Sequence, residues 1–161
     1  MREKSWLSAD EPITVSELKG GVSSVVLKIV APDKRWVLKQ ALPRLRVEQE
    51  WLSSVERIGR EQECLIYLSE RLTYLSRILR RNLIPKIIHR DPENHLYIMS
   101  CASDDAENWR DRLLAGHADA VTAASVGSLL GQIHSFSHAD EKAARQFGDK
   151  RFFHELRLDP F

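Results

Sequence analysis

Cysteine is scarce in this chain of 161 residues, where only Cys64 and Cys101 occur. They are too far apart for a metal-binding pair or a disulfide framework, so we expect two reduced thiols packed as small apolar side chains. Long apolar runs are lacking as well, since none approaches the roughly 18 residues needed to cross a bilayer. Residues 1–12 have no apolar centre of the kind found in secretory signals. These absences predict a cytoplasmic protein with no membrane partner.

An excess of either charge is also missing, because 24 Lys and Arg residues balance 23 Asp and Glu residues. Nucleic-acid-binding domains usually carry a clear basic excess on one face, so no nucleic-acid partner is expected. Neither the Walker glycine pattern nor the dinucleotide-binding pattern occurs. With 43% hydrophobic and 29% charged residues, the composition is that of an ordinary globular protein, and the length favours one domain or slightly more.

The order of the apolar patterns predicts strands first and helices second. Short β-branched or alternating runs, separated by turn residues, predict five strands at residues 13–18, 25–30, 36–40, 86–89 and 95–99. Apolar residues three and four apart predict helices at residues 43–58, 60–79, 109–114 and 118–138, with Gly59 as a break. Residues 147–161 form a mixed tail. This order favours an α+β fold with an antiparallel sheet.

Two adjacent glycines stand between the first two predicted strands. Gly20 and Gly21 allow the backbone to approach a ligand closely, and the amides of such a turn can face phosphate oxygens. Taken alone, a paired-glycine hairpin that binds nothing is at least as good an interpretation.

A lysine and a glutamate follow the glycine turn. Lys39 lies in the apolar strand 36–40 on the same face as Val37, where an unpaired ammonium is costly and an anionic partner is expected. The alternative is a lysine at a sheet edge whose ammonium reaches solvent. Glu61 lies in the first turn of the next predicted helix, where the helix dipole favours a carboxylate. Protein-kinase-like folds assemble their ATP site in this order: glycine turn, strand lysine, helix glutamate.

On these residues the sequence resembles the aminoglycoside phosphotransferase and choline kinase group of small-molecule kinases. The resemblance covers nearly the whole chain, and its last segment is most similar to members of the methylthioribose kinase-like branch. It rests on the order and spacing of these segments: residues 18–24, 36–39, Trp51, Arg57, 60–61, 65–68, 84–88, Asp91, 97–99, 108–109, 113–116, 129–134 and 152–161.

The resemblance implies a protein-kinase-like N-terminal lobe over residues 1–102, with an antiparallel sheet, a flanking helix and a hinge at residues 98–102. Residues 103–161 would be the first helices of a C-terminal lobe. The implied cofactor is ATP, with Mg²⁺ in the complete enzyme. The implied partner is a small-molecule acceptor such as a sugar or amino sugar, phosphorylated on a hydroxyl.

The resemblance also implies roles for individual residues. Lys39 would contact the ATP phosphates and Glu61 would hold Lys39, with Glu63 as a rival carboxylate that fits the family spacing less well. Ser100 and Ala102 would pair with adenine through the Ser100 carbonyl and the Ala102 amide.

The glycine turn would cover the phosphates, through Gly20, Gly21, Ser23 and Ser24. Ser24 departs from the family, since relatives often have an asparagine at this position.

The family's catalytic His-Gly-Asp segment, its following asparagine and its second, Mg²⁺-binding aspartate are not found in the chain. The nearest pairs, Gly148-Asp149 and His138-Ala139-Asp140, precede the segment that should come before the catalytic loop. His134 and His138 are four residues apart, but we expect them to be structural because no third ligand is nearby in sequence.

We therefore expect no catalytic and no metal-binding residue in this chain, and we interpret it as the truncated ATP-binding part of a kinase. The alternative is a non-catalytic nucleotide-binding or protein-interaction module. Either could self-associate through an apolar face that a missing lobe would leave exposed.

Overall fold

A computed structural model of the protein describes residues 7–8, 10–80 and 82–159. Its contacts divide the chain into two compact units, one made of Met1–Cys101 with Lys150–Phe161 and the other of Ala102–Asp149. The boundary near residue 101 lies beside the hinge expected from the sequence. The contacts group residues 150–161 with the first unit, whereas the resemblance implies that they belong to the second lobe. Pro160 and Phe161 of that segment lie outside the described residues.

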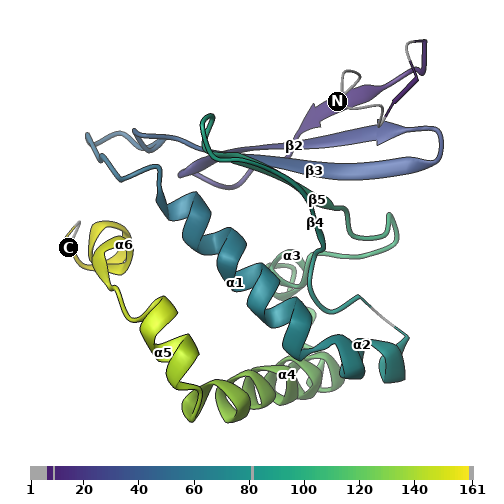
Figure 1. The fold of residues 1–161 in the computed structure, drawn as a ribbon. Helices are drawn as coiled ribbons and strands as arrows, with labels where there is room; N and C mark the ends of the chain where they lie inside the picture. The colour runs from purple at the N-terminus through teal and green to yellow at the C-terminus, as the bar shows by residue number, and fades with distance from the viewer. Residues whose placement is uncertain (1–6, 9, 81, 160–161) are drawn as a thin grey trace. The chain divides into compact units, whose positions relative to one another are not determined.

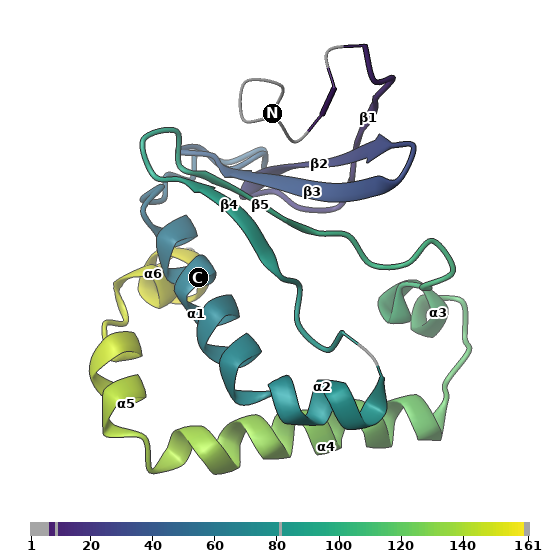
Figure 2. The same cartoon turned by 45° about the vertical axis from the view of Figure 1, so that its right-hand side comes forward.

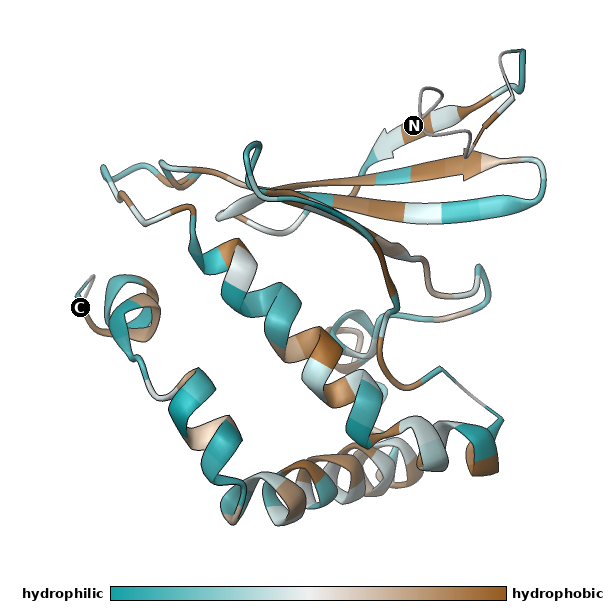
Figure 3. Ribbon diagram, in the orientation of Figure 1, coloured by the Kyte–Doolittle hydropathy of each residue, from teal (hydrophilic) through white to brown (hydrophobic). Residues whose placement is uncertain are grey.

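The first unit is built on a five-stranded sheet with the strand order β1-β2-β3-β5-β4 (Figures 1 and 2). Every neighbouring pair is antiparallel, which confirms the predicted antiparallel sheet. The strands are β1 (Thr14–Glu17), β2 (Ser24–Ala31), β3 (Lys34–Ala41), β4 (Ile87–Asp91) and β5 (Leu96–Ser100). Figure 3 shows β2 mostly in brown, as its Val, Leu and Ile residues dictate.

Alternation along β3 sends its side chains to two different apolar clusters. On one face, Trp36 packs with the buried residues Leu7, Ile29, Ala31 and Ile98. On the other face, Ala41 packs with Ile58 and Tyr97. Lys39 alternates with Ala41 and Val37, so it belongs to the second face.

That second face is covered by helix α1 (Arg57–Arg71), which lies beside the sheet in both views (Figures 1 and 2). A short helix, α2 (Thr73–Leu79), follows it. The sequence predicted one helix from residue 60 to 79, but the structure separates two helices at Leu72, whose side chain is buried. At Leu72 the backbone leaves the helical conformation, with φ −95° and ψ 5°, and α2 begins at the next residue.

The helix predicted at residues 43–58 is wrong for nearly all of its length. Residues 42–56 form an irregular segment with a bridge between Arg44 and Leu52, and the Leu45 amide donates to the Trp51 carbonyl at 2.9 Å. Helix α1 begins only at Arg57 and runs through Gly59, which does not break it. Glu61 consequently lies in the second turn of α1 and not in its first.

The C-terminal residues of the first unit form a single helical turn, α6 (Arg151–Phe153), that continues as a π-helix, η1 (His154–Leu158). The second unit holds three helices, α3 (Trp109–Leu114), α4 (Ala120–His138) and α5 (Glu141–Phe147). Each of these three begins at a side-chain cap, provided by Asn108, Asp119 and Asp140. Within the described part of the chain, no helix combines the length and the apolar character needed to cross a membrane.

Candidate functional site

Lys39 lies in the middle of the sheet. It is in register with Val26 of β2 on one side and with Tyr97 of β5 on the other. Its neighbours on the same face, Val37 and Ala41, are buried, and the Lys39 side chain itself is 24% exposed. The ammonium group therefore lies at the margin of the apolar cluster and needs a negatively charged partner.

Glu61 of α1 provides that partner. The Lys39 Nζ and Glu61 Oε1 atoms are 2.5 Å apart, and the Glu61 side chain is 40% exposed. Glu63, the rival carboxylate, lies 3.9 Å from Arg60 instead. The structure thus brings together the lysine and the glutamate that the sequence singled out. Nucleotide binding by this pair stays a prediction.

Tyr97 completes the cluster from β5. Its hydroxyl donates to the same Glu61 Oε1 atom at 2.9 Å, and the residue is fully buried. Burial raises the pKa of Tyr97 well above its ordinary value, and the charge of Glu61 and the hydrogen bond to Glu61 raise it further. The phenol is therefore a permanent donor that orients the carboxylate toward Lys39. Sequence reasoning missed Tyr97, although its position opposite Lys39 could have been found by pairing the predicted strands in register.

The glycine turn joins β1 to β2. Gly20 has φ +111°, which favours glycine, and a Cβ atom added there or at Gly21 would meet no atom within 4 Å. No described residue accepts a hydrogen bond from the amide of either glycine. With respect to the described residues, the turn is thus open, and its two glycine amides are available to a ligand.

Val22 and Ser23, which follow the glycines, are hydrogen-bonded to the segment after β3. The Ser23 carbonyl accepts from the Leu42 amide at 3.0 Å, and the Val22 carbonyl accepts from the Arg46 amide at 2.9 Å. Ser24 is already the first residue of β2, where it is buried. Phosphate contacts by Ser23 and Ser24 stay predictions.

The expected hinge begins at the end of β5. The Ser100 amide donates to the Lys86 carbonyl at 2.9 Å, and its Oγ accepts from the Lys86 amide at 2.9 Å. Ala102 is exposed and is the first residue of the second unit. The adenine contacts of the Ser100 carbonyl and the Ala102 amide stay predictions.

Arg57, the first residue of α1, has contacts that the sequence analysis did not foresee. It is 8% exposed, and its guanidinium donates to four backbone carbonyls, those of Ser23, Leu42, Ser53 and Ser54. Burial lowers the pKa of Arg57, while the nearby carboxylates, that of Glu155 foremost, act in the opposite direction. The sequence carried no local signal for these contacts, because neither predicted helix, 43–58 or 60–79, starts at Arg57, and the helix start there is seen only in the structure.

Glu155 of η1 binds the segment that precedes α1. Its carboxylate accepts from the Ser54 amide at 2.8 Å, the Ser54 hydroxyl at 2.7 Å and the Ser53 hydroxyl at 3.0 Å. The Trp51 indole N–H donates to the Glu155 carbonyl at 2.9 Å. The hydrogen bonds from Ser54 are the main reason why the pKa of Glu155 is lowered. The C-terminal segment is therefore part of the same hydrogen-bonded network as Arg57.

Asp140, one of the two aspartates considered as catalytic candidates, has a structural contact at the start of a helix. The Asp140 side chain caps α5 by accepting from the Lys142 and Ala143 amides at 3.0 and 3.1 Å. Among the described residues, no three His, Cys, Asp or Glu side chains lie close enough together to hold a metal ion.

No family model matches the chain. A comparison with curated proteins finds 31% identity over 127 residues with a protein named methylthioribose kinase from Exiguobacterium sibiricum. The chain is similar to a small-molecule kinase. The aligned region covers 78% of this chain and 30% of that kinase, so the chain spans less than a third of its length. The similarity agrees in part with the resemblance deduced from the sequence.

Proposed function

We propose that this chain is the ATP-binding, N-terminal part of a protein-kinase-like phosphotransferase that acts on a hydroxyl group of a small molecule. The similarity to methylthioribose kinase favours a sugar as the acceptor. The His-Gly-Asp segment that resembling kinases use for transfer does not occur in these 161 residues. The proposal therefore assigns nucleotide binding, and no transfer step, to this chain.

The observation that carries the proposal is the ion pair between Lys39 and Glu61. An ammonium group has three donors, and Glu61 uses one of them at 2.5 Å. Because the Lys39 side chain is still 24% exposed, the other donors remain accessible to an anion. A lysine that is fixed in this way binds a phosphate oxygen without first losing side-chain freedom.

The glycine turn fits a phosphate in a second way. The open side of Gly20 and the two amides without a described acceptor are what a turn needs to bind phosphate oxygens through its backbone. Mg·ATP, when bound, supplies the phosphoryl group that is transferred. In the proposal, Lys39 binds and orients its phosphates, Glu61 and Tyr97 hold Lys39, and the turn excludes water from above the phosphates.

Calorimetric titration with Mg·ATP tests this function. Lys39→Ala removes a charge-assisted hydrogen bond of about 1.5–3 kcal/mol, so we expect affinity to fall about 10- to 100-fold. Lys34→Ala is the matched control, since Lys34 is an exposed residue of the same strand, and its affinity should stay within about twofold of wild type.

A second matched pair tests the helix carboxylate. Glu61→Gln should weaken Mg·ATP binding, and Glu63→Gln, two residues further along α1, should not. If the folded wild-type chain does not bind Mg·ATP, the proposed function is wrong, and a protein-interaction module becomes the better interpretation.

A further inference from the structure

The start of α1 contains an unusual electrostatic arrangement. Helices favour acidic residues in the first turn, because unpaired amides give that end a partial positive charge. Helix α1 has no acidic residue there and begins with Arg57, which is buried. A buried cation at the positive end of a helix needs strong compensation from other groups.

The compensation comes from carbonyl oxygens of three separate segments. Arg57 Nη1 donates to the Ser53 and Ser54 carbonyls at 3.1 and 2.8 Å, in the segment just before the helix. Arg57 Nη2 donates to the Leu42 carbonyl at 2.8 Å, just after β3, and to the Ser23 carbonyl at the end of the glycine turn. A guanidinium group holds its donors in a rigid planar fork, so these segments are fixed relative to one another.

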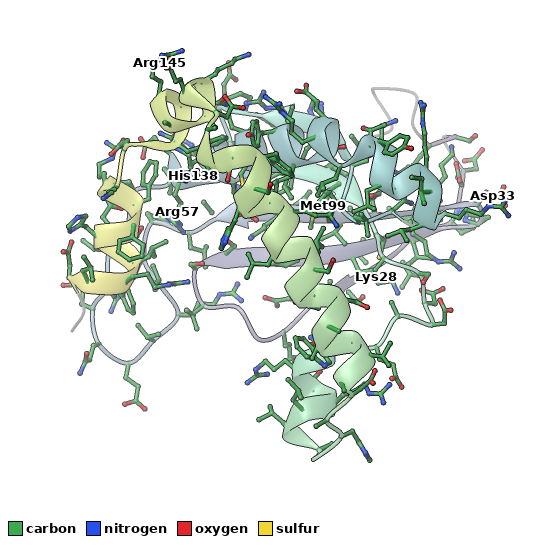
Figure 4. The ribbon with its side chains drawn as sticks, turned by 90° about the horizontal axis from the view of Figure 1, so that it is seen from below. Lys28, Asp33, Arg57, Met99, His138 and Arg145 are labelled. Carbon is green, nitrogen blue, oxygen red and sulfur yellow. The ribbon has the colours of Figure 1, made fainter. Side chains whose placement is uncertain are left out.

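Arg57 and Glu61 are four residues apart on α1 and therefore lie on the same side of the helix. Arg57 holds the end of the glycine turn, and Glu61 holds the strand lysine. Both groups that would bind phosphate are thus attached to one rigid helix, one turn apart. Figure 4 shows Arg57 at the opposite end of the sheet from Asp33, which lies in the β2–β3 hairpin.

We propose that Arg57 is a positioning residue that fixes the glycine turn at the distance from the Lys39–Glu61 pair that phosphate binding requires. This inference rests on the proposed function. Glu155 supports Arg57 in two ways, because its charge favours the guanidinium and its carboxylate binds Ser53 and Ser54, whose carbonyls Arg57 uses. The C-terminal segment is therefore connected to the glycine turn through Arg57.

Arg57→Lys tests the inference, because it keeps the positive charge and removes the fork. The matched control is Arg90→Lys, which removes a 2.7 Å hydrogen bond from Arg90 Nε to the buried Gln62 of the same helix but does not reach the turn. Docking of the turn is measured by hydrogen exchange at the Leu42 and Arg46 amides, which donate to the Ser23 and Val22 carbonyls.

In Arg57→Lys we expect these two amides to exchange about tenfold faster, since the loss of one or two hydrogen bonds is worth about a factor of ten. The amides of the β3–β5 ladder should be unchanged, which separates local release of the turn from a general loss of stability. Mg·ATP affinity should fall about five- to tenfold. Arg90→Lys should change neither the exchange at Leu42 and Arg46 nor the affinity.

Should Arg57→Lys fail to fold, Glu155→Gln provides the second variant, because it leaves Arg57 in place and weakens its supporting segment. We expect the same two amides to exchange faster, by a smaller factor. Unchanged exchange at these amides in either folded variant overturns the inference, and so does unchanged Mg·ATP affinity. If the wild-type chain does not bind Mg·ATP at all, the proposed function fails, and the nucleotide-binding role of Arg57 fails with it. The exchange data then still decide if Arg57 holds the turn.

Discussion

The hydroxyl group of Tyr97 can be removed without altering the packing of its ring, through Tyr97→Phe. Tyr97 is fully buried, and its hydroxyl donates to Glu61 Oε1 at 2.9 Å. Hydrogen bonds to charged groups contribute about 1.5–3 kcal/mol to stability. Glu61 keeps its ion pair with Lys39 and is 40% exposed, so water can replace part of the lost bond. We therefore expect a loss near the lower limit, about 1–1.5 kcal/mol.

Urea unfolding followed by tryptophan fluorescence measures this loss. A Trp109→Phe background makes the signal specific for the first unit, because Trp109 is the tryptophan of the second unit. Its buried indole N–H has no hydrogen-bond partner among the described residues, so this replacement removes no known hydrogen bond. For a protein of this size, the expected loss corresponds to a decrease in Tm of about 2–6 °C.

Tyr74→Phe is the control, because Tyr74 is 76% exposed, and its stability should stay within about 0.5 kcal/mol of the background. A Tyr97→Phe protein as stable as this control would refute the assignment of the hydroxyl as a buried donor to Glu61.

High pH gives an independent readout of the same bond. Since the pKa of Tyr97 is raised in the folded state, the folded protein keeps this proton at pH values where the unfolded chain loses it. The resulting stability is complete below the ordinary tyrosine pKa of about 10 and decreases as pH rises above it. Wild type should lose stability between pH 10 and about 11 more steeply than Tyr97→Phe, by up to about 1.4 kcal/mol per pH unit.

The remaining predictions concern the C-terminal segment and two glycines. Glu155→Gln should lower stability by about 1 kcal/mol at pH 7. Because the pKa of Glu155 is lowered in the folded state, its contribution should be complete above about pH 5 and disappear as pH falls through the folded-state pKa, which acid titration of both proteins measures. Gly148→Ala should destabilise by about 1–3 kcal/mol, because its Cβ would lie 2.5 Å from the Ala144 carbonyl oxygen. Gly127→Ala, inside α4 with no atom within 4 Å, should stabilise by about 0.5–1 kcal/mol, and thermal unfolding in which both glycine variants shift Tm the same way would contradict this contrast.

The strands could be predicted because their signal is local. Alternating and β-branched runs, with turn residues such as Asp91 and Asn94 between them, locate β4 and β5 to within a residue or two. The Asp91 carboxylate accepts from the Asn94 amide at 3.2 Å, as such turns require. The pairing of Lys39 with Glu61 could be expected from the family order of motifs, because two rigid elements bring these side chains together.

The segment before α1 could not be predicted, because distant residues decide its conformation. Its apolar residues have helical spacing, but Trp51 donates to Glu155, 104 residues further along the chain. The Ser53 and Ser54 hydroxyls donate to the same distant residue, so the conformation of these serines cannot be deduced from local propensity. For the same reason the start of α1 was misplaced, and with it the turn in which Glu61 lies.

The contact between Trp51 and Glu155 has a consequence for the order of events during protein synthesis. About 100 residues, among them the whole second unit, are translated after Trp51 and before its partner. At roughly 5–20 residues per second, this takes about 5–20 s. During that interval the segment that holds Trp51, Ser53 and Ser54 leaves the ribosome without the carboxylate that binds it. The second unit has to be accommodated as a long loop, whose closure entropy grows only slowly with its length. The first unit is therefore expected to complete its fold late and to be a substrate for chaperones until then.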